Sequence, residues 1–367
     1  MPRSRPPPAA DAAGRRGFAQ VESGASVIVT VTPSPSIDWT VNVNSFEFAA
    51  VNIVASKSRE ASGKGINVSV ALHRNGVDTV AVFPAGQETG RFLVTELQAQ
   101  DVRIASVESG HDVRTNITLL VPGHSGTKIN ETGTALPGHI LDQILSTCRA
   151  TLEQGLEAGR PVMMAICGSL PPGTPEHFHR NLIRLGRDLG VPTVVDASGE
   201  VLSAAISEQP DLIKPNVHEL AHEAGRNIET LGDVMAAAQD LRGRGVGSVL
   251  ASLGADGMML VDGAGALHGQ ADGVNVVNTV GAGDAALAGF LAGLAAEGGR
   301  TACLRSALLY ASSAVGHETT LFEVDPSIAG RISVDADFDT ALRLTEPSVG
   351  PAPSATQSTN RTVAANI

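Results

Sequence analysis

The sequence alternates short runs of apolar, often β-branched residues with longer segments whose apolar residues recur at helical spacing. Runs typical of buried strands lie at 27–31, 80–83, 162–166, 193–196, 212–214, 248–252 and 258–261. Helical spacing is found at 67–75, 90–100, 141–156, 176–189, 234–244, 282–296 and 301–315. Strands separated by helices of this length form βαβ units. We therefore expect an α/β fold with a mainly parallel central sheet flanked by helices.

Two segments interrupt this rhythm. Residues 37–58 have the character of an antiparallel β ribbon, and 115–121 and 127–130 flank the glycine-containing turn 122–126. Both segments lie in the N-terminal part of the chain. We expect them to pair into a small sheet that covers one edge of the molecule.

Composition marks the ends of the folded region. Residues 1–25 are rich in Pro, Ala and Arg, and residues 347–367 are rich in Pro, Ser, Thr and Ala. We expect both to be disordered extensions of one domain over residues 26–346. Arg15–Phe18 loosely resembles a twin-arginine export signal, but Glu22 places a charge directly downstream and the apolar run 27–31 is too short for a signal core.

Composition also excludes several classes of protein. Lys plus Arg is 26 and Asp plus Glu is 38, a net charge of −12, which argues against nucleic-acid binding through bulk charge. No apolar run reaches the roughly 18 residues of a membrane span. The cysteines Cys148, Cys167 and Cys303 are odd in number and widely spaced, so we expect buried thiols and a cytoplasmic protein.

Polar and glycine residues follow almost every predicted strand. They are Asp38, Gly168-Ser169, Asp196, Lys214-Pro215-Asn216, Ser252-Leu253-Gly254 and Gly281–Asp284. Ligands bind at the carboxyl ends of strands in doubly wound sheets. A polar group at so many consecutive ends predicts a binding site at this edge.

The strongest single motif is Asn278–Asp284, which leads into a helix of small residues. Gly281, Ala282 and Gly283 permit backbone amides to approach an anion at the positive end of a helix. Asp284 would repel phosphate in a simple phosphate loop. As a general base, however, it would accept a hydroxyl proton while the amides hold charge on a transferring phosphoryl group. The alternative is that Asp284 only caps the helix.

A second motif is Ala61–Asn67, which enters the helix 67–75. Gly63 and Gly65 permit close backbone approach, and Lys64 and Asn67 offer polar contacts. The motif is not a Walker A loop, because Gly65 and not Ser or Thr follows Lys64. The alternative is an ordinary glycine-rich turn with a helix cap.

Three weaker signals remain. Asn216 and Glu219 are three residues apart and offer oxygen ligands that suit Mg²⁺, although an N-cap with a Glu partner has the same spacing. Ser252–Gly257 is a strand–turn–strand whose amides could contact nucleotide phosphates. Arg114 precedes a strand and could hold a phosphate through two hydrogen bonds, or lie solvated on the surface.

Taken together, these segments resemble the PfkB-type carbohydrate kinases of the ribokinase-like fold. The resemblance covers about 27–339 and is carried by Thr32–Asp38, Gly63–Asn67, Gly168–Gly173, Val195–Glu200, Lys214–Glu219, Ser252–Gly257 and Thr279–Asp284. Within the family the chain is most similar to the kinases of fructose 1-phosphate. That similarity rests on Gly63–Val68, Val113–Leu119 and Lys128–Glu131.

The resemblance implies a role for each matching residue. Asp284 would be the base, and Gly281, Ala282 and Gly283 the anion hole. Mg²⁺ would be organised by Asn216 and Glu219, with help from Asp196. The ATP site would be lined by Ser252, Gly254, Asp256, Gly257, Lys214 and Thr279. The sugar phosphate would be contacted by Asp38, Gly63, Lys64, Asn67, Arg114 and Ser169.

The resemblance also implies a lid, made from about 37–60 and 112–131, that closes over the sugar and supports a homodimer. The implied reaction is ATP- and Mg²⁺-dependent phosphorylation of a ketohexose phosphate, with no nucleic-acid or membrane partner. Because both substrates are anions and the chain is acidic, binding must depend on local amides, Mg²⁺ and cations such as Lys64 and Arg114.

Two positions depart from the family pattern. Ser62 stands where the family usually has Gly, and Ile53 stands where sugar-phosphate kinases commonly carry a basic residue. Lys57, Arg59, Lys64 and Arg114 are candidates to compensate for Ile53. Fructose 6-phosphate, tagatose 6-phosphate, an unphosphorylated sugar and a nucleoside therefore remain open as substrates. So does an inactive, ligand-sensing homologue.

Overall fold

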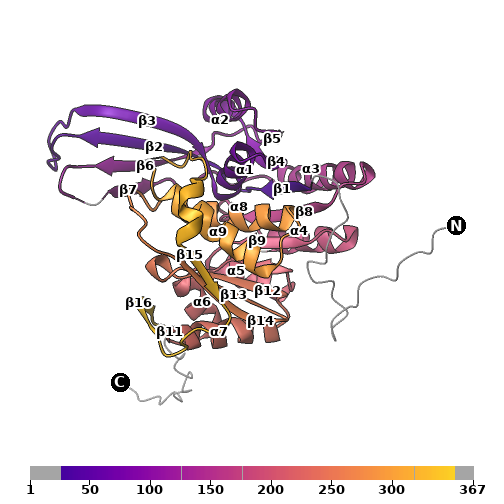
Figure 1. Cartoon of the computed structure of the whole chain (residues 1–367). Coiled ribbons are helices and arrows are strands. Elements are labelled where there is room, and N and C mark those ends of the chain that lie inside the picture. The colour runs from indigo at the N-terminus through magenta and orange to yellow at the C-terminus, as the bar shows by residue number, and fades with distance from the viewer. Residues whose placement is uncertain (1–25, 125, 176, 318, 352–367) are drawn as a thin grey trace, which may run out of the picture.

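The computed structural model describes residues 26–351, apart from positions 125, 176 and 318 (Figure 1). In this part of the chain the central sheet has ten strands, in the order β15-β14-β13-β12-β10-β9-β8-β1-β4-β5. Those from β12 to β5 pair in parallel, while β13, β14 and β15 add antiparallel strands at one edge. The expected mainly parallel sheet is confirmed. The strands are β1 (Val27–Val31), β4 (Thr79–Ala85), β5 (Ile104–Glu108), β8 (Val162–Cys167), β9 (Thr193–Asp196), β10 (Leu212–Ile213), β12 (Ser248–Ser252), β13 (Met258–Asp262), β14 (Gly265–Ala271) and β15 (Ile332–Asp335).

The central strands are buried along their whole length because both faces of the sheet are covered. In β1, Val27, Val29 and Val31 pack into one hydrophobic cluster and Ile28 packs into another on the opposite face. This period of two follows from the pleat of a strand. Helices therefore have to cover each face.

Two groups of helices do so. One face is covered by α3 (Gly138–Glu157), α4 (His177–Leu189), α5 (Gly199–Ser207), α6 (Val217–Ala224) and α7 (Leu231–Gly243). The other is covered by α1 (Lys64–Arg74), α2 (Gln87–Ala99), α8 (Ala282–Ala295) and α9 (Arg300–Ala314). Every helix expected from the spacing is present. α1, however, begins at Lys64 and not at Asn67, because Gly63 has a φ of 125° and turns the chain directly into the helix.

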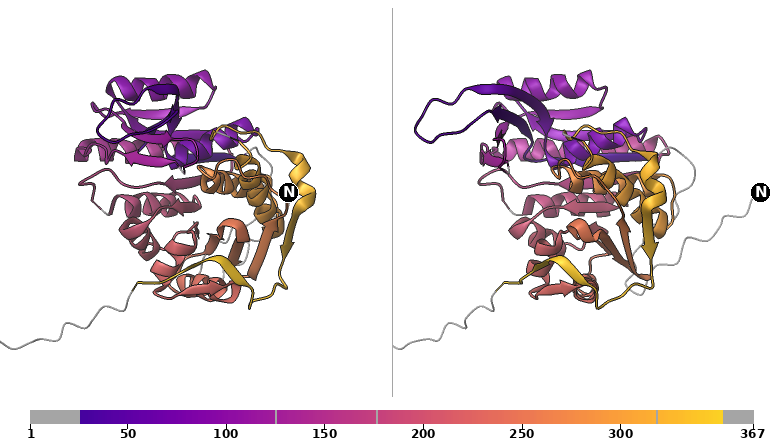
Figure 2. Two further views of the ribbon diagram at one scale, coloured as in Figure 1. Left: turned by 90° about the vertical axis from the view of Figure 1, so that its left-hand side faces the viewer. Right: turned by 60° about the vertical axis from the view of Figure 1, so that its left-hand side comes forward.

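A four-stranded sheet projects from this body, in the order β3-β2-β6-β7 (Figure 2). Its strands are β2 (Ser36–Val43), β3 (Val54–Ser62), β6 (Arg114–Leu120) and β7 (Thr127–Asn130). β2–β3 and β6–β7 are antiparallel ribbons, as expected, and a parallel β2–β6 pair joins them. We refer to this sheet as the projecting sheet.

The C-terminal boundary differs slightly from expectation. β16 (Arg343–Ser348) pairs with β11 (Ile228–Thr230), so regular structure continues past residue 346. The predicted extension over 1–25 and the rest of the predicted tail, 352–367, lie outside the described residues. The three cysteines are buried free thiols, as expected. In the described part of the chain, no helix has the length and apolar character needed to cross a membrane.

Candidate active site

The carboxyl ends of β8, β9 and β10 bring several predicted residues together. These strands are neighbours in the sheet, and Gly168, Asp196 and Lys214 lie at or just after their ends. The amide of Gly168 donates to the carbonyl of Asp196 at 2.8 Å, and the amide of Lys214 donates to the carbonyl of Val195 at 2.9 Å. The parallel arrangement thus places the ends side by side, as expected for a doubly wound sheet.

Asp196 forms a buried ion-pair cluster with two lysines. Its Oδ1 lies 2.6 Å from Nζ of Lys64 and its Oδ2 lies 3.0 Å from Nζ of Lys214. Burial alone would raise the pKa of Asp196, but the charges of Lys214 and Lys64 outweigh it and hold that pKa below its usual value. Burial likewise opposes the charged form of Lys64, yet Asp196 and Asp284 raise its pKa. Asp196 and Lys64 are therefore both charged at neutral pH.

Asp284 lies in the first turn of α8 and only 8% of its surface is exposed. Its Oδ2 accepts a hydrogen bond from Nδ2 of Asn67 at 2.8 Å. Burial and the nearby charge of Asp196 raise the pKa of Asp284 to about 6, although Lys64, Asn67 and Lys214 oppose the shift. A carboxylate poised near neutral pH suits general-base chemistry. The N-cap residue of α8 is Gly281 and Asp284 lies inside the first turn, so the capping alternative is not supported.

Asp38, on β2 of the projecting sheet, accepts three hydrogen bonds. Ser36 Oγ and Asn116 Nδ2 donate to its Oδ1 at 3.1 and 3.0 Å, and Ser62 Oγ donates to its Oδ2 at 2.8 Å. Ser62 Oγ also lies 3.4 Å from Oδ1 of Asn67. A continuous polar path therefore runs from Asp38 through Ser62 and Asn67 to Asp284.

Close packing requires glycine at Gly65 in the start of α1, whereas a Cβ at Gly283 in the start of α8 would make only an ordinary contact. At Gly65 a Cβ would come within 2.5 Å of Thr32 Oγ1, and at Gly283 within 3.4 Å of Lys214 Nζ. Gly281 has a φ of 80° in the left-handed region and precedes α8 directly. The carbonyl of Thr279 accepts from the amide of Ala282 at 3.3 Å, which closes the turn. The start of α8 thus lies beside the ammonium group of Lys214.

Asn216 and Glu219 form a capping box at the start of α6. Oδ1 of Asn216 accepts from the amides of His218 and Glu219, and Oε2 of Glu219 accepts from the amide of Asn216, each at 2.9 Å. Glu219 is nonetheless near the charged cluster, since its charge contributes to the raised pKa of Lys64. Among the residues described, no group of three or more His, Cys, Asp or Glu side chains could hold a metal ion.

The turn Ser252–Gly257 is a strand–turn–strand, as expected, and Gly254–Asp256 forms a short 3-10 helix. Ser252 is linked to Asn216 by a parallel β-bridge. Gly254 and Gly257 have φ of 62° and 83°, which favours glycine at both positions. The Asp256 carboxylate accepts two hydrogen bonds from Thr345, so its side chain anchors the turn to β16.

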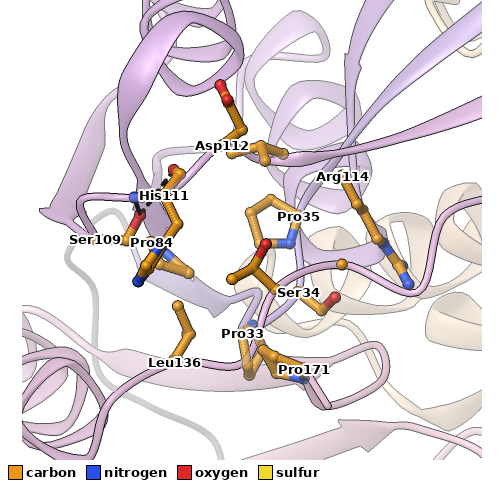
Figure 3. A pocket seen from close by; sticks show the side chains of 13 residues that line it. Pro33, Ser34, Pro35, Pro84, Ser109, His111, Asp112, Arg114, Leu136 and Pro171 are labelled. Atoms are coloured by element: carbon orange, nitrogen blue, oxygen red, sulfur yellow. Dashed lines mark hydrogen bonds between the residues drawn. The ribbon is translucent and has the colours of Figure 1, made fainter.

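Arg114 lies at one end of a surface pocket next to the projecting sheet (Figure 3). Its Nε is buried, and among the described residues it has no hydrogen-bond partner. Burial lowers the pKa of Arg114, opposed by the charge of Asp38, but an arginine remains protonated at neutral pH. Ser169 is exposed and follows Gly168, where a Cβ would lie 3.9 Å from Cβ of Lys64.

The candidates to compensate for Ile53 have different surroundings. Lys57 lies 5.6 Å from the centroid of Trp39, and Arg59 lies 5.6 Å from Trp39 and 4.6 Å from Phe92. Lys64 is paired with Asp196. Arg114 is the candidate whose buried Nε has no hydrogen-bond partner among the described residues, while Ile53 itself is 76% exposed.

The motifs did not identify two residues of this network, Ser62 and Asn116. Asn116 is two positions from Arg114 and so shares its face of β6, a signal that the period of two provides. It also lies directly opposite Asp38 in the β2–β6 register, which no local pattern predicts. Ser62 stood out in the sequence only as a position at which the chain departs from the family pattern.

Comparison with known proteins shows which family the chain belongs to. Residues 29–325 match the model of the pfkB family carbohydrate kinases. The chain belongs to this family. It is therefore an enzyme, a phosphotransferase with an alcohol group as acceptor. It is 36% identical over 265 residues to a 1-phosphofructokinase of Rhodobacter capsulatus. The aligned residues make up 72% of this chain and 82% of the relative.

Two further relatives cover more of the chain. A 1-phosphofructokinase of Haloferax volcanii is 35% identical over 291 residues, 79% of this chain and 91% of the relative. The tetrameric inhibited form of phosphofructokinase-2 from Escherichia coli superposes with a TM-score of 0.72 at 31% identity, over 83% of this chain and 98% of that one. The expected ribokinase-like fold of this family is confirmed.

Proposed function

We propose that this carbohydrate kinase transfers the γ-phosphoryl group of ATP to the free primary hydroxyl of a ketohexose phosphate, with fructose 1-phosphate as the preferred acceptor. The product would be fructose 1,6-bisphosphate. The observation that carries the proposal is the Asn67–Asp284 pair beside the cluster of Lys64, Asp196 and Lys214. The names of the relatives from Rhodobacter capsulatus and Haloferax volcanii support the choice of acceptor.

Asp284 is the proposed base. Its carboxylate takes the proton of the acceptor hydroxyl as the oxygen attacks the γ-phosphorus, and Asn67 keeps the carboxylate oriented. Gly281 and Gly283 lie at the start of α8, where helical hydrogen bonding leaves amides free for the developing charge. Ala282, the third residue expected in the anion hole, already donates its amide to the carbonyl of Thr279. Lys214, next to Gly283, adds a positive charge at the same place.

The donor site is proposed at the turn Ser252–Gly257 and at Lys214 and Thr279. Glu219 suits Mg²⁺ because one of its oxygens is held by the amide of Asn216 and the other can accept a metal-bound water. Asn216 then acts by fixing Glu219. Asp196, which is neutralised by two lysines, acts by fixing those cations. When bound, Mg²⁺ would neutralise charge on the donor phosphates.

The acceptor site is proposed along the polar path from Asp38 to Asn67, with Gly63, Lys64 and Ser169 beside it. Asp38 can accept hydrogen bonds from sugar hydroxyls. The guanidinium group of Arg114 is available for the phosphate already on the sugar, because its buried Nε has no partner among the described residues. This orphaned donor favours a phosphorylated acceptor over a free sugar or a nucleoside.

A substrate panel tests the proposal. ADP formation is measured with Mg²⁺-ATP and fructose 1-phosphate, fructose 6-phosphate, tagatose 6-phosphate or fructose, for the natural chain and for Ile53→Arg. The highest kcat/KM is expected for fructose 1-phosphate in the natural chain. Turnover of unphosphorylated fructose alone would exclude the proposed acceptor class. ATP binding with no turnover of any sugar would favour an inactive, ligand-sensing homologue.

We further propose that the projecting sheet is a lid and that it joins two copies of the chain. The sheet and the loop between β2 and β3 expose large apolar side chains that a monomer would leave in water, namely Phe46, Phe48, Val51, Ile53, Val54, Leu120 and Ile129. The name of the Escherichia coli relative, which describes a tetramer, supports self-association in the family. Light scattering after size exclusion should give a dimer for the natural chain and a monomer for Phe48→Ser. A monomeric natural chain would contradict this assignment.

A further inference from the structure

The last described strand, β16, forms hydrogen bonds with segments that are far from it in the sequence. It lies beyond the residues matched by the family model, which end at 325. In Figure 1 it lies beside β11, at the end of the body opposite α2. Two of its side chains reach the segments proposed to hold the phosphate donor.

The first link joins Thr345 to the turn Ser252–Gly257. The amide and Oγ1 of Thr345 donate to Oδ2 and Oδ1 of Asp256, each at 2.7 Å. From the other side, Nε2 of His268 lies 2.8 Å from the carbonyl oxygen of Asp256. Gly257 packs so tightly that a Cβ there would collide with the carbonyl oxygen of Gly269. The turn is therefore held between β14 and β16.

The second link joins Ser348 to the start of α6. Oγ of Ser348 lies 2.7 Å from Nδ1 of His218, which is in the same helical turn as Glu219. The two linked segments are neighbours, because Asn216 and Ser252 form a β-bridge. One strand thus ties together both segments proposed for the donor and its metal.

We propose that β16 is a positioning element of the donor site, in which Thr345 fixes the Ser252–Gly257 turn through Asp256 and thereby sets the affinity for the nucleotide. This inference rests on the proposed function, which places the donor at that turn. Holding a binding loop in its bound geometry reduces the ordering cost of binding. Asp256 accordingly acts through the turn and does not contact the ligand.

Thr345→Val tests the proposal, since it removes the hydroxyl donor and keeps the amide. KM for ATP and the Kd of Mg²⁺-ADP, measured by calorimetry, should rise roughly five- to tenfold, the size of one hydrogen bond. KM for the sugar phosphate should stay within twofold. Thr345→Ser keeps the hydroxyl and should restore both nucleotide constants. Arg343→Gln, which removes an exposed ion pair of the same strand with Glu229, is the matched control and should change neither.

Unchanged nucleotide constants in Thr345→Val would overturn the inference. So would equal rises in both KM values with a lowered unfolding midpoint, which indicate a general loss of stability. If the natural chain phosphorylates no sugar, the proposed function fails, while the Mg²⁺-ADP titration still tests the strand. A natural chain that neither turns over a sugar nor binds Mg²⁺-ADP would overturn both.

Discussion

Nδ2 of Asn67 donates a 2.8 Å hydrogen bond to Oδ2 of Asp284, and this bond joins the two glycine-rich helix starts of the molecule. Asn67 lies on α1 and Asp284 on α8, separated by 217 positions in the chain. The bond stabilises the ionised carboxylate and fixes its direction. It is therefore the structural basis for giving Asp284 the role of base.

Asp284→Asn should lower kcat by roughly 10²–10⁴-fold, because an amide cannot accept the hydroxyl proton. KM values should change little, since the side chain keeps its size. Initial rates with saturating substrates measure the effect, and circular dichroism checks that the fold is retained. Turnover within tenfold of the natural chain would contradict the assignment.

The pH profile should have an acid limb set by Asp284. The base works in its ionised form, and its pKa is raised to about 6, so kcat/KM, which reports the free enzyme, should fall as pH drops through about 6. Asn67→Ala removes the hydrogen bond that favours the ionised form. The pKa of Asp284 should then rise further and move the limb to higher pH. Profiles of kcat/KM for both proteins between pH 5 and 9 test this; a limb that stays in place or moves to lower pH would count against it.

Ser62→Ala should weaken acceptor binding through Asp38. The variant removes the 2.8 Å bond to Oδ2 of Asp38 and frees that carboxylate to turn. One hydrogen bond contributes about 0.5–1.5 kcal/mol, so KM for the sugar phosphate should rise by roughly two- to tenfold. KM for ATP serves as the internal control and should not change. A rise in KM for ATP alone would show that Ser62 acts on the donor site and not on the acceptor site.

Arg114→Gln should discriminate between acceptors with and without a phosphate. Hydrogen bonds to charged groups contribute about 1.5–3 kcal/mol, so KM for fructose 1-phosphate should rise by roughly 10- to 150-fold. Any residual activity on fructose should be unaffected. The comparison is made by kcat and KM for both acceptors. Equal losses on both would show that Arg114 acts on the fold and not on the phosphate.

Asp196→Asn should destabilise the protein strongly. It leaves Lys64 and the buried Lys214 without their anion, and breaking a buried pair costs about 3–5 kcal/mol of the free energy of unfolding. Arg149→Gln, which removes an exposed i,i+4 pair with Glu153, should cost less than about 0.5 kcal/mol. Urea unfolding at pH 7 measures both. Similar small losses would show that the cluster contributes little to stability.

Local patterns predicted most of the fold. β1 and β8 consist almost entirely of apolar residues and are buried on both faces, which fits only the centre of a covered sheet. Most of the predicted helices have an apolar face that covers the sheet, whereas α8 is buried on all sides from Asp284 to Gly293. Short elements such as α5, β11 and β16 escaped prediction, since their burial depends on neighbours from distant parts of the chain.

The same distinction applies to the site. Gly281–Asp284 and Gly63–Asn67 could be predicted, because glycines before a helix have a local physical reason. The partner of each side chain could not, because pairs such as Asn67–Asp284 and Thr345–Asp256 depend on tertiary packing. The capping box of Asn216 and Glu219 is intermediate, since its spacing fits both a cap and a metal site.

The most direct test of the central claim is to identify the products of one reaction. The natural chain is incubated with Mg²⁺-ATP and fructose 1-phosphate, and phosphorus NMR follows the transferred group. The account predicts ADP and fructose 1,6-bisphosphate in equal amounts, with the new ester on the C6 oxygen. ADP with free inorganic phosphate, or no consumption of fructose 1-phosphate while another acceptor is phosphorylated, would contradict it.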